Sequence, residues 1–515
     1  MASGESTTPL PFVGFGEMVV DPGTSRVFVS SGPAGSAVAV FDLAGNLEET
    51  ITGQQGATGM ALDAASGTLY VALQNASAIS VIDTDTLLET ARLPTTGLSA
   101  PRWLARAGER LWFSYACPSS GWASMALDGS DIGTVAGGPT YCATFAPSPT
   151  DPDMLAAVNI GTTPRFYLYD VSTGTPSEIR NSFRAGDSDN VRQIAFAPEG
   201  TELLVASGAP YQVQALRVSD LTLANAYVTG PYPLAVALTG DGAYVAGGAD
   251  AAYAPDVFVF TRGGTEVRRW ELGTSELVAR GLAFGPAASQ LFAVMKNSAS
   301  TEYALKVFGS PTIPPAPTTT TLAPSASTVA FNKRVTLTAR VTGGGGGSVS
   351  FYATPHGGSK TLLKAVPLAS GRASLAYTMK KKTTFSAIYA GTDFHASSAS
   401  ANKVVRVRAR TTVKLSGFYA RSGKYKLYRT TSRPRVTGTV APNHAGQSLR
   451  FILQRYSSRR WRTIDTAAIP IQSTGSAYAI LRGNATGRYR VRTRFAGDSD
   501  HLAHASPWAY LRVTR

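Results

Sequence analysis

The histidines of this chain limit the chemistry that its two parts can perform. The chain has five histidines, and all of them lie beyond residue 355: His356, His395, His444, His501 and His504. The first 310 residues therefore offer no imidazole for general-base catalysis, zinc ligation or a Ser-His-Asp arrangement. Carboxylate-only chemistry remains open, but the nearest candidate, "GDSD" at 186–189, is interpreted as an ordinary loop. We expect no catalytic residue, no cofactor and no metal ligand.

The two cysteines of the chain lie in one region of its first part. Cys117 follows an apolar run, "LWFSYAC", and Cys142 precedes another, in "GGPTYC". We predict a disulfide that fixes the loop around Trp122, with two buried thiols as the alternative. Such a bridge would contribute roughly 3 kcal/mol and would indicate an oxidising compartment.

Aromatic and acidic residues gather between the apolar runs of the first 310 residues. Exposed rings with acid and amide neighbours suit sugar or peptide ligands. The alternative is that each ring covers its own loop. The candidate ligand-binding residues are Trp122, Tyr141, Asp187, Asp189, Tyr211, Tyr232, Asp250 and Tyr253.

Arginines alternate along two predicted strands of the last 200 residues. Alternate residues of a strand face the same side, so each set should form a basic row. Like charges in a row destabilise a sheet unless something anionic covers them, and guanidinium groups match phosphate and carboxylate. The alternatives are a solvated face or pairing with the acidic part of the chain, and no motif indicates nucleic acid. The candidate polyanion-binding residues are Arg488, Arg490, Arg492 and Arg494, with Arg406, Arg408 and Arg410 in a shorter row.

Charge divides the chain at a Pro/Thr-rich segment. Residues 1–310 hold 16 Lys and Arg against 29 Asp and Glu, whereas residues 311–515 hold 32 against four. This asymmetry predicts two parts with different partners, joined by an extended linker at 311–318. No run approaches 18 apolar residues, so we expect no membrane span.

A pattern of paired short strands recurs in the first part. Examples are "MVVDPGTSRVFVSS", "MALDAASGTLYVAL" and "IAFAPEGTELLVAS", and seven copies have matching positions near residues 21, 63, 106, 146, 197, 239 and 285. Four strands repeated every 40–50 residues are typical of propeller blades. The chain, through "GTLYVAL" and "ISVIDTDTLLE", resembles seven-bladed β-propellers of the YVTN-repeat type, which implies such a ring over residues 1–310. The last copy lacks a strand, which Thr7–Val13 could supply to close the ring.

One phrase occurs twice in the basic part, as "YAGTDFHASSAS" from residue 389 and "FAGDSDHLAHAS" from residue 495. Several short strands surround each copy, which predicts two β-sandwiches at 319–408 and 409–515. These segments resemble bacterial Ig-like repeats, which end in an aromatic-x-Gly-Asp phrase. The phrase would then be a turn between the last strands, with Gly391 and Gly497 permitting the turn. We expect His395 and His501 to serve that turn.

The fold class expected is all-β, a seven-bladed propeller followed by two Ig-like sandwiches. The function expected is a non-enzymatic extracellular binding or adhesion protein: a propeller face that recognises a glycan or protein, and a basic tail that contacts an anionic cell envelope. The alternatives are a lactonase- or glycosidase-like propeller enzyme with an anchoring tail, and a component of an extracellular assembly. "MASGESTTPL" has no apolar signal core, so either the chain is intracellular or a signal peptide has been removed. The predicted disulfide and the resemblance to Ig-like repeats favour the second alternative, a secreted or cell-surface protein.

Overall fold

The chain forms two compact units, Met1–Pro314 and Pro315–Arg515. The computed structural model describes residues 5–118, 121–249, 255–392, 394–481 and 485–515. These residues form strands, with two single-turn 3-10 helices, η1 (Ala185–Asp187) and η2 (Pro286–Ala288). No helix in the described ranges has the length and apolarity needed to cross a membrane.

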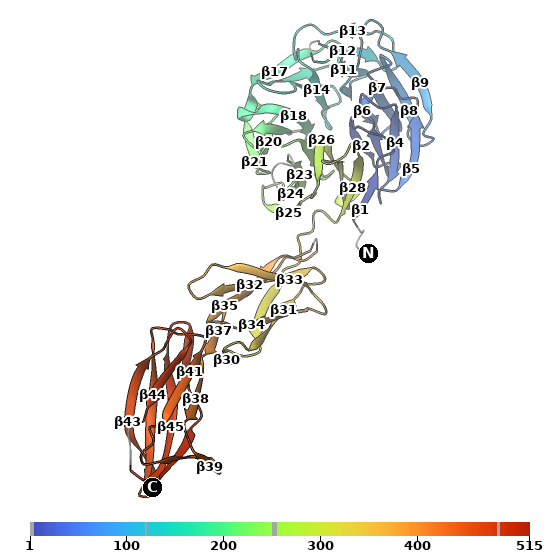
Figure 1. The fold of residues 1–515 in the computed structure, drawn as a ribbon. Helices are drawn as coiled ribbons and strands as arrows, with labels where there is room; N and C mark the ends of the chain where they lie inside the picture. Colours follow the sequence, from blue (N-terminus) through green and yellow to red (C-terminus); the bar gives the residue numbers. More distant parts are fainter. Residues whose placement is uncertain (1–4, 119–120, 250–254, 393, 482–484) are drawn as a thin grey trace. The chain divides into compact units, whose positions relative to one another are not determined.

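The first unit is a β-propeller: its described residues form seven four-stranded antiparallel sheets around a common centre (Figure 1). The strands of the first four sheets are β2 (Met18–Asp21), β3 (Arg26–Ser30), β4 (Ala37–Asp42) and β5 (Leu47–Thr52); β6 (Ala57–Asp63), β7 (Thr68–Leu73), β8 (Ala78–Asp83) and β9 (Glu89–Pro94); β10 (Leu104–Ala107), β11 (Arg110–Ser114), β12 (Trp122–Ala126) and β13 (Gly133–Thr134); β14 (Ala143–Pro147), β15 (Met154–Asn159), β16 (Arg165–Asp170) and β17 (Ser177–Phe183). Those of the other three are β18 (Asp189–Phe196), β19 (Glu202–Ala209), β20 (Gln212–Arg217) and β21 (Leu223–Tyr227); β22 (Ala235–Leu238), β23 (Tyr244–Gly248), β24 (Val257–Thr261) and β25 (Glu266–Trp270); β26 (Ser275–Phe284), β27 (Gln290–Asn297), β28 (Tyr303–Gly309) and β1 (Ser6–Pro9).

The N-terminal strand β1 closes the ring. It pairs antiparallel with β28, with Ser6 opposite Val307 and Pro9 opposite Ala304, and so forms the outer edge of the last sheet. This confirms that the segment before the first repeat supplies the missing strand. The strand is shorter than predicted and stops at Pro9; because proline cannot donate a backbone hydrogen bond, an edge position accommodates it.

The middle strands of the propeller sheets are buried on both faces. In β7, "TLYVAL", five of six residues are buried, because the neighbouring sheets cover both sides of the strand. The sequence there is a continuous apolar run rather than an alternating one, as expected for a strand with no solvent face. The cores between adjacent sheets consist of such side chains, for example Phe28, Val40, Leu69 and Ile82.

The second unit consists of two β-sandwiches, each a three-stranded sheet packed on part of a longer sheet. In the first, the three-stranded sheet is β29 (Thr319–Pro324), β31 (Arg334–Thr342) and β34 (Arg372–Thr378); the longer sheet contributes β30 (Thr328–Ala330), β32 (Ser348–Pro355), β33 (Thr361–Pro367), β35 (Thr383–Tyr389), β36 (Ser398–Ala399) and β37 (Lys403–Arg408). In the second, the sheet of three is β38 (Arg410–Ser416), β41 (Arg435–Ala441) and β44 (Ser476–Ile480); the longer sheet adds β39 (Ala420–Ser422), β40 (Tyr425–Arg429), β42 (Ser448–Ser457), β43 (Arg460–Pro470), β45 (Gly487–Gly497), β46 (His501–Ala505) and β47 (Ala509–Thr514).

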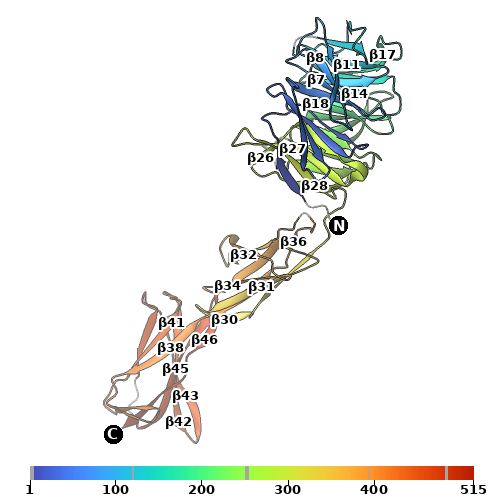
Figure 2. The same cartoon turned by 90° about the vertical axis from the view of Figure 1, so that its right-hand side faces the viewer.

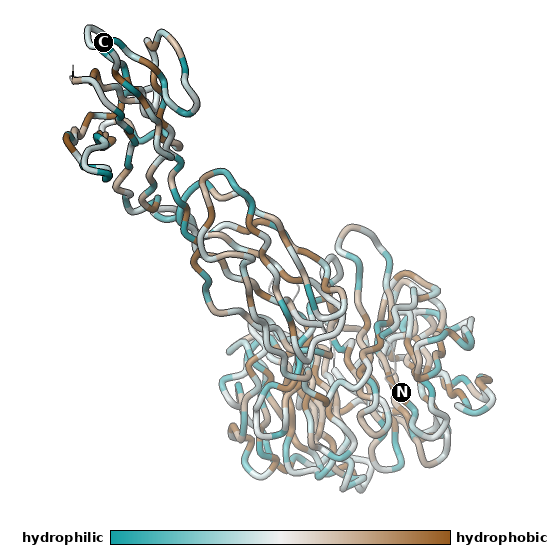
Figure 3. The backbone as a smooth tube through the Cα atoms, turned by 90° about the horizontal axis from the view of Figure 1, so that it is seen from below, coloured by the Kyte–Doolittle hydropathy of each residue, from teal (hydrophilic) through white to brown (hydrophobic). Residues whose placement is uncertain are grey.

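Strands of the second unit alternate in polarity, in contrast to those of the propeller. In β31, "RVTLTARVT", Val335, Leu337, Ala339 and Val341 enter the core and the residues between them do not. One face of each sheet therefore meets the other sheet and the opposite face meets solvent. Figure 3 shows hydrophobic and hydrophilic residues alternating along the backbone.

The two sandwiches share a sheet edge. Strand β37 pairs in parallel with β30 and with β46, placing Val407 beside His501. Figure 2 labels β30 and β46 where the two sandwiches meet. The segment predicted as a linker is only partly free, because the Ala316 amide already donates to the Phe394 carbonyl of the second unit at 2.9 Å. The first strand of the first sandwich starts at Thr319.

Candidate functional site

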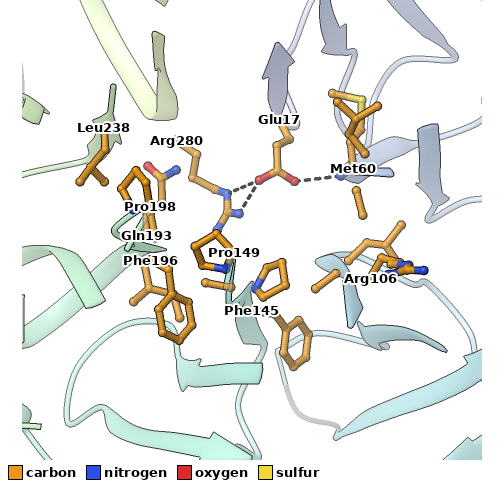
Figure 4. A pocket seen from close by; sticks show the side chains of 18 of the residues that line it. Glu17, Met60, Arg106, Phe145, Pro149, Gln193, Phe196, Pro198, Leu238 and Arg280 are labelled. Atoms are coloured by element: carbon orange, nitrogen blue, oxygen red, sulfur yellow. Dashed lines mark hydrogen bonds and ion pairs between the residues drawn. The ribbon is translucent and has the colours of Figure 1, made fainter. Parts of the chain in front are cut away.

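The centre of the propeller contains a buried arginine–glutamate pair. Arg280 lies in a bulge of β26 with a left-handed φ of 66°, and its guanidinium pairs with Glu17, which directly precedes β2 (Figure 4). The other carboxylate oxygen of Glu17 accepts the Met60 amide at 2.8 Å. The pair therefore joins the first, second and last sheets across the centre of the ring.

Two further contacts satisfy Arg280. Its Nη1 donates to Thr144 Oγ1 at 2.6 Å, and its guanidinium lies 4.3 Å from the ring centroid of Trp103. A buried charge is tolerated when it is paired and hydrogen-bonded, and this one meets both conditions. The first strand of each sheet, from β2 to β26, surrounds the centre of the ring and is here named an inner strand. Arg280 lines two cavities, one at each end of these inner strands.

The cavity at the N-terminal ends of the inner strands, here named the arginine mouth, has a volume of about 440 Å³. Arg102 and Arg192 line it with Arg280, and no carboxylate of the described residues lies within 4 Å of either Arg102 or Arg192. Burial, and then the nearby Arg280 charge, lower the pKa of Arg102. The buried donors Arg192 Nε and Trp103 Nε1 have no acceptor among the described residues. The arginine mouth is therefore suited to a ligand that carries anionic oxygens.

The cavity at the opposite end has a volume of about 490 Å³ and a different lining. Phe145, Pro149, Phe196 and Leu238 contribute apolar surface (Figure 4). Its Arg106 lies 3.7 Å from Asp63 and 3.6 Å from Glu109. Because carboxylates already compensate this arginine, the second cavity lacks the uncompensated charge of the arginine mouth.

Of the aromatic residues predicted to bind a ligand, Tyr141 lines the arginine mouth and is 52% exposed. The prediction for Trp122 is wrong: its side chain is 1% exposed and packs against Trp112, Phe145 and Tyr169. Its indole nitrogen donates to the Gly137 carbonyl at 3.1 Å. The indole of Trp122 is buried because it fills the space between the third and fourth sheets of the propeller.

The other predicted propeller residues that the structure describes, Asp187, Asp189, Tyr211 and Tyr232, do not line the arginine mouth. Tyr211 and Tyr232 form an edge-to-face pair with centroids 5.3 Å apart, in loops at the same end of the sheets. Asp187 is exposed, whereas Asp189 pairs with Arg184 and accepts the Thr163 amide at 2.8 Å. The carboxylate of Asp189 is thus occupied by Arg184 and by the loop between β15 and β16. Asp250 and Tyr253 lie outside the described residues.

The predicted disulfide between Cys117 and Cys142 is confirmed. Cys117 follows β11 and Cys142 precedes β14, with Cα atoms 5.0 Å apart. Cys142 and Pro118 both line the arginine mouth, beside Tyr141. The bridge therefore fixes one wall of that cavity.

Sequence reasoning missed the arginines of the arginine mouth. Each stands two residues before an apolar residue of an inner strand: Arg102 before Leu104, Arg192 before Ile194 and Arg280 before Leu282. The signal was present as an arginine at the same place in three repeats. The prediction did not use this signal, because it placed the ligand-binding surface in the loops and not at the starts of the inner strands.

The predicted arginine row of β45 lies on one side of the strand, as expected. Tyr489, Val491 and Phe495 are buried on the other side. The two inner arginines are covered by aromatic rings: Arg490 lies 4.6 Å from Trp461 and 4.2 Å from Trp508, and Arg492 lies 4.4 Å from Trp508. At Arg490 and Arg492, cation–π contacts therefore offset the repulsion within the row without an anion.

The outer arginines of that row lie directly opposite other arginines. Arg494 pairs in register with Arg450, and Arg488 with Arg512, and all four side chains are exposed. No described carboxylate lies within 4 Å of these four arginines. In the shorter row Arg406 and Arg408 are exposed on β37, whereas Arg410 is exposed at the start of β38. Arg488 also lies 4.4 Å from the ring centroid of Tyr456, so the Arg450–Arg494 pair is the part of this surface where two exposed arginines face each other without a ring contact or carboxylate among the described residues.

In sequence, neither a protein-family model nor a curated protein matches this chain. Among solved structures, hydrazine synthase of Kuenenia stuttgartiensis is similar, with a TM-score of 0.47 and 14% identity over 58% of this chain and 96% of that one. The β-propeller domain of Cps50 (Swd1) from Myceliophteria thermophila also has a TM-score of 0.47 and 14% identity, over 59% of this chain and 99% of that one. Similarity at this level says nothing about ligand or activity.

Proposed function

We propose that this chain is a non-enzymatic extracellular binding protein, built as a seven-bladed YVTN-type propeller followed by two Ig-like sandwiches. The propeller captures an anionic glycan, one that carries carboxylate or phosphate groups, at the arginine mouth. The observation that carries this proposal is the pair Arg102 and Arg192, which line a cavity of about 440 Å³ without a carboxylate partner among the described residues.

Two features support a glycan as the ligand. Tyr141, Tyr303 and Phe15 line the same cavity and offer ring faces beside the charges. Sugar recognition combines such faces with a few fixed polar groups. The disulfide at its wall favours an oxidising, extracellular compartment.

The test is binding of the intact chain to an array of neutral and acidic glycans. The double variant Arg102→Ala, Arg192→Ala should lose the acidic glycans bound by the parent, by about tenfold or more, because charge-assisted hydrogen bonds are worth roughly 1.5–3 kcal/mol each. Arg106→Ala, at the opposite cavity, is the matched control and should bind as the parent does. Retained binding in the double variant, or binding to neutral glycans alone, contradicts the proposal.

The second unit holds an anionic cell-envelope polymer in the same proposal. The support is the pairing of Arg450 with Arg494, because like charges opposite each other destabilise a sheet unless an anion lies over them. Binding of the intact chain to polyphosphate should weaken as salt screens the charges. Arg450→Ser with Arg494→Ser should reduce that binding, and Arg334→Ser, an exposed arginine of β31, should not. Equal binding by all three proteins contradicts this assignment.

A further inference from the structure

The turn after β45 brings two histidines and a carboxylate together. Asp498 follows the last residue of β45, His501 begins β46, and His444 comes from the loop between β41 and β42. One possible ligand atom from each residue lies within 4.8 Å of those from the others. Each imidazole is 6% exposed, whereas the Asp498 side chain is 23% exposed. The cluster is thus enclosed by protein on the histidine side and accessible to solvent at the carboxylate.

The hydrogen bonding of His501 leaves a lone pair directed at Asp498. Its Nε2 lies 2.7 Å from the Lys380 carbonyl oxygen, which can only accept, so Nε2 carries the proton. In the neutral ring Nδ1 is then an acceptor. This atom is buried, has no hydrogen-bond partner among the described residues, and lies 3.6 Å from Asp498 Oδ1. Two acceptors that face each other repel unless a proton on Nδ1 or a metal ion lies between them.

The second imidazole approaches the other oxygen of the same carboxylate. His444 Nδ1 lies 3.1 Å from Asp498 Oδ2, and the two histidine rings are 4.9 Å apart. The ring of His444 is stacked on Phe495 at 4.3 Å, which fixes its plane. His444 Nε2 is buried and has no hydrogen-bond partner among the described residues, whereas Nδ1 can donate to Asp498 Oδ2. A metal ion bound at Nδ1 would take the place of the proton in that contact, and the ring proton would then be carried by Nε2.

The carboxylate of Asp498 is oriented from outside the cluster. Its Oδ1 accepts the amides of Asp500 and His501 at 2.8 and 2.7 Å, and its Oδ2 accepts Gln447 Nε2 at 3.1 Å. Metal ligands are commonly held in this way: a histidine donates its other N–H to a carbonyl, and the carboxylate is itself hydrogen-bonded. The His501 bond to Lys380 and the turn around Asp498 both follow that pattern.

Each nitrogen–oxygen separation is close to that of two ligands of one ion. At metal–ligand bonds of about 2.1 Å, two ligand atoms lie roughly 3.0 Å apart at a right angle and roughly 3.4 Å apart in a tetrahedron. His444 Nδ1 lies 3.1 Å from Asp498 Oδ2, His501 Nδ1 lies 3.6 Å from Asp498 Oδ1, and one ligand atom from each of the three residues lies within 4.8 Å of the others. Two imidazoles with one carboxylate suit a borderline divalent cation such as Zn²⁺, and not Ca²⁺ or Mg²⁺, which prefer oxygen ligands.

We propose that His444, His501 and Asp498 bind a zinc-class divalent cation, with the remaining coordination position open to solvent on the side of Asp498. The sequence predicts only a turn-stabilising role for His395 and His501, because His444 is distant from His501 in the chain and no local spacing pattern joins the two. The site also lies where the two sandwiches meet, because the Lys380 carbonyl that orients His501 belongs to the first sandwich. Bound zinc would therefore fix the β46 turn against the Lys380 loop. This inference is independent of the glycan and polymer proposals.

The test measures zinc binding to the intact chain, first stripped with a chelator and carrying no affinity tag. A chromogenic chelator competes for Zn²⁺, and metal content is determined after desalting. The parent should retain one zinc per chain, and His444→Ala should weaken binding by about 100-fold, since changes to outer partners of metal ligands alone cost 10–100-fold. His395→Ala and His504→Ala are the matched controls and should bind zinc as the parent does.

A second variant keeps the test decisive if His444→Ala disturbs the fold. Asp498→Asn retains an Oδ1 that can accept the Asp500 and His501 amides, so the turn should form, but the charged ligand is lost. It should also lose zinc while its circular dichroism stays that of the parent. A parent that retains no zinc, or an Asp498→Asn variant that retains as much as the parent, overturns the proposal.

Discussion

The two copies of the aromatic-Ala-Gly turn place the same histidine in different surroundings. In the first, Gly391 to His395, the Thr392 hydroxyl lies 2.9 Å from His395 Nδ1 and can donate to it. In the second, Gly497 to His501, the corresponding residue is Asp498, and its oxygen lies 3.6 Å from His501 Nδ1. A hydroxyl satisfies the ring nitrogen, whereas a carboxylate cannot donate to it. The exchange of Thr392 for Asp498 therefore distinguishes a histidine that only stabilises its turn, His395, from one proposed to bind a metal ion, His501.

The loops that cover the two turns also differ: the β31–β32 loop has glycines over the first turn, whereas the β41–β42 loop has His444 over the second. In the first sandwich a side chain added at Gly344 would meet the Tyr389 ring at 3.3 Å, and one added at Gly345 would meet His395 at 3.2 Å. In the second sandwich His444 occupies such a place, stacked on Phe495. The same backbone plan thus holds glycines over one turn and an imidazole over the other. The fold provides the position, and the side chain decides its chemistry.

The largest effect is expected when the second turn is converted to the first. Asp498→Thr with His444→Gly should abolish stabilisation of the second unit by zinc. At zinc concentrations about 100-fold above Kd, binding adds about 2.7 kcal/mol, or roughly 5–10 °C in Tm for a unit of this size. Scanning calorimetry of the intact chain, with and without zinc, measures the shift. A double variant that still responds as the parent does would break the comparison.

A smaller effect is expected from deleting each histidine in the absence of metal. His501→Ala removes the bond to the Lys380 carbonyl and the ring contacts with His444 and Phe331, and should lower the free energy of unfolding by about 2 kcal/mol. His395→Ala removes a half-buried ring bonded within its own turn, and should cost less than about 1 kcal/mol. Urea unfolding of the intact chain in chelator compares the two. Equal losses would show that His501 has no special role at the junction.

The smallest effect is expected at Asp500, which lies 2.9 Å from Nδ1 of His356 in the first sandwich. Phe394 stands at the corresponding place in the first turn. Because both partners of the His356 pair are partly exposed, Asp500→Ser should cost less than about 1 kcal/mol, and less still at high salt. Urea unfolding at low and high salt measures this, and zinc binding should remain. A loss of zinc here would assign Asp500, rather than Asp498, to the site.

Much of the fold could be predicted from the sequence because its signals are local. The predicted repeat positions, such as Asp21 and Asp63, fall at or near the ends of the first strands of the sheets. Short apolar runs and the Gly, Asp and Pro turns between them define strands without reference to distant residues. The N-terminal closing strand was predictable because a ring cannot leave an open edge.

The sites could be predicted only in part, because distant residues assemble them. Glu17 and Arg280 are separated by 263 positions and meet only when the ring closes. His444 reaches His501 through the packing of one loop on a turn, which no spacing rule describes. Trp122 shows the opposite error, since its type and neighbours indicated exposure but the gap between two sheets buries it. Composition predicted which chemistry was possible, and the fold decides where it occurs.

Anomalous diffraction at the zinc edge, on crystals of the intact chain soaked in zinc chloride, tests the central claim most directly. One strong peak should lie within about 2.2 Å of His444, His501 and Asp498, at distances typical of zinc, and none should lie at His395. A peak that requires His395 or His356 as ligand, or no peak between the two buried imidazoles, would contradict the account.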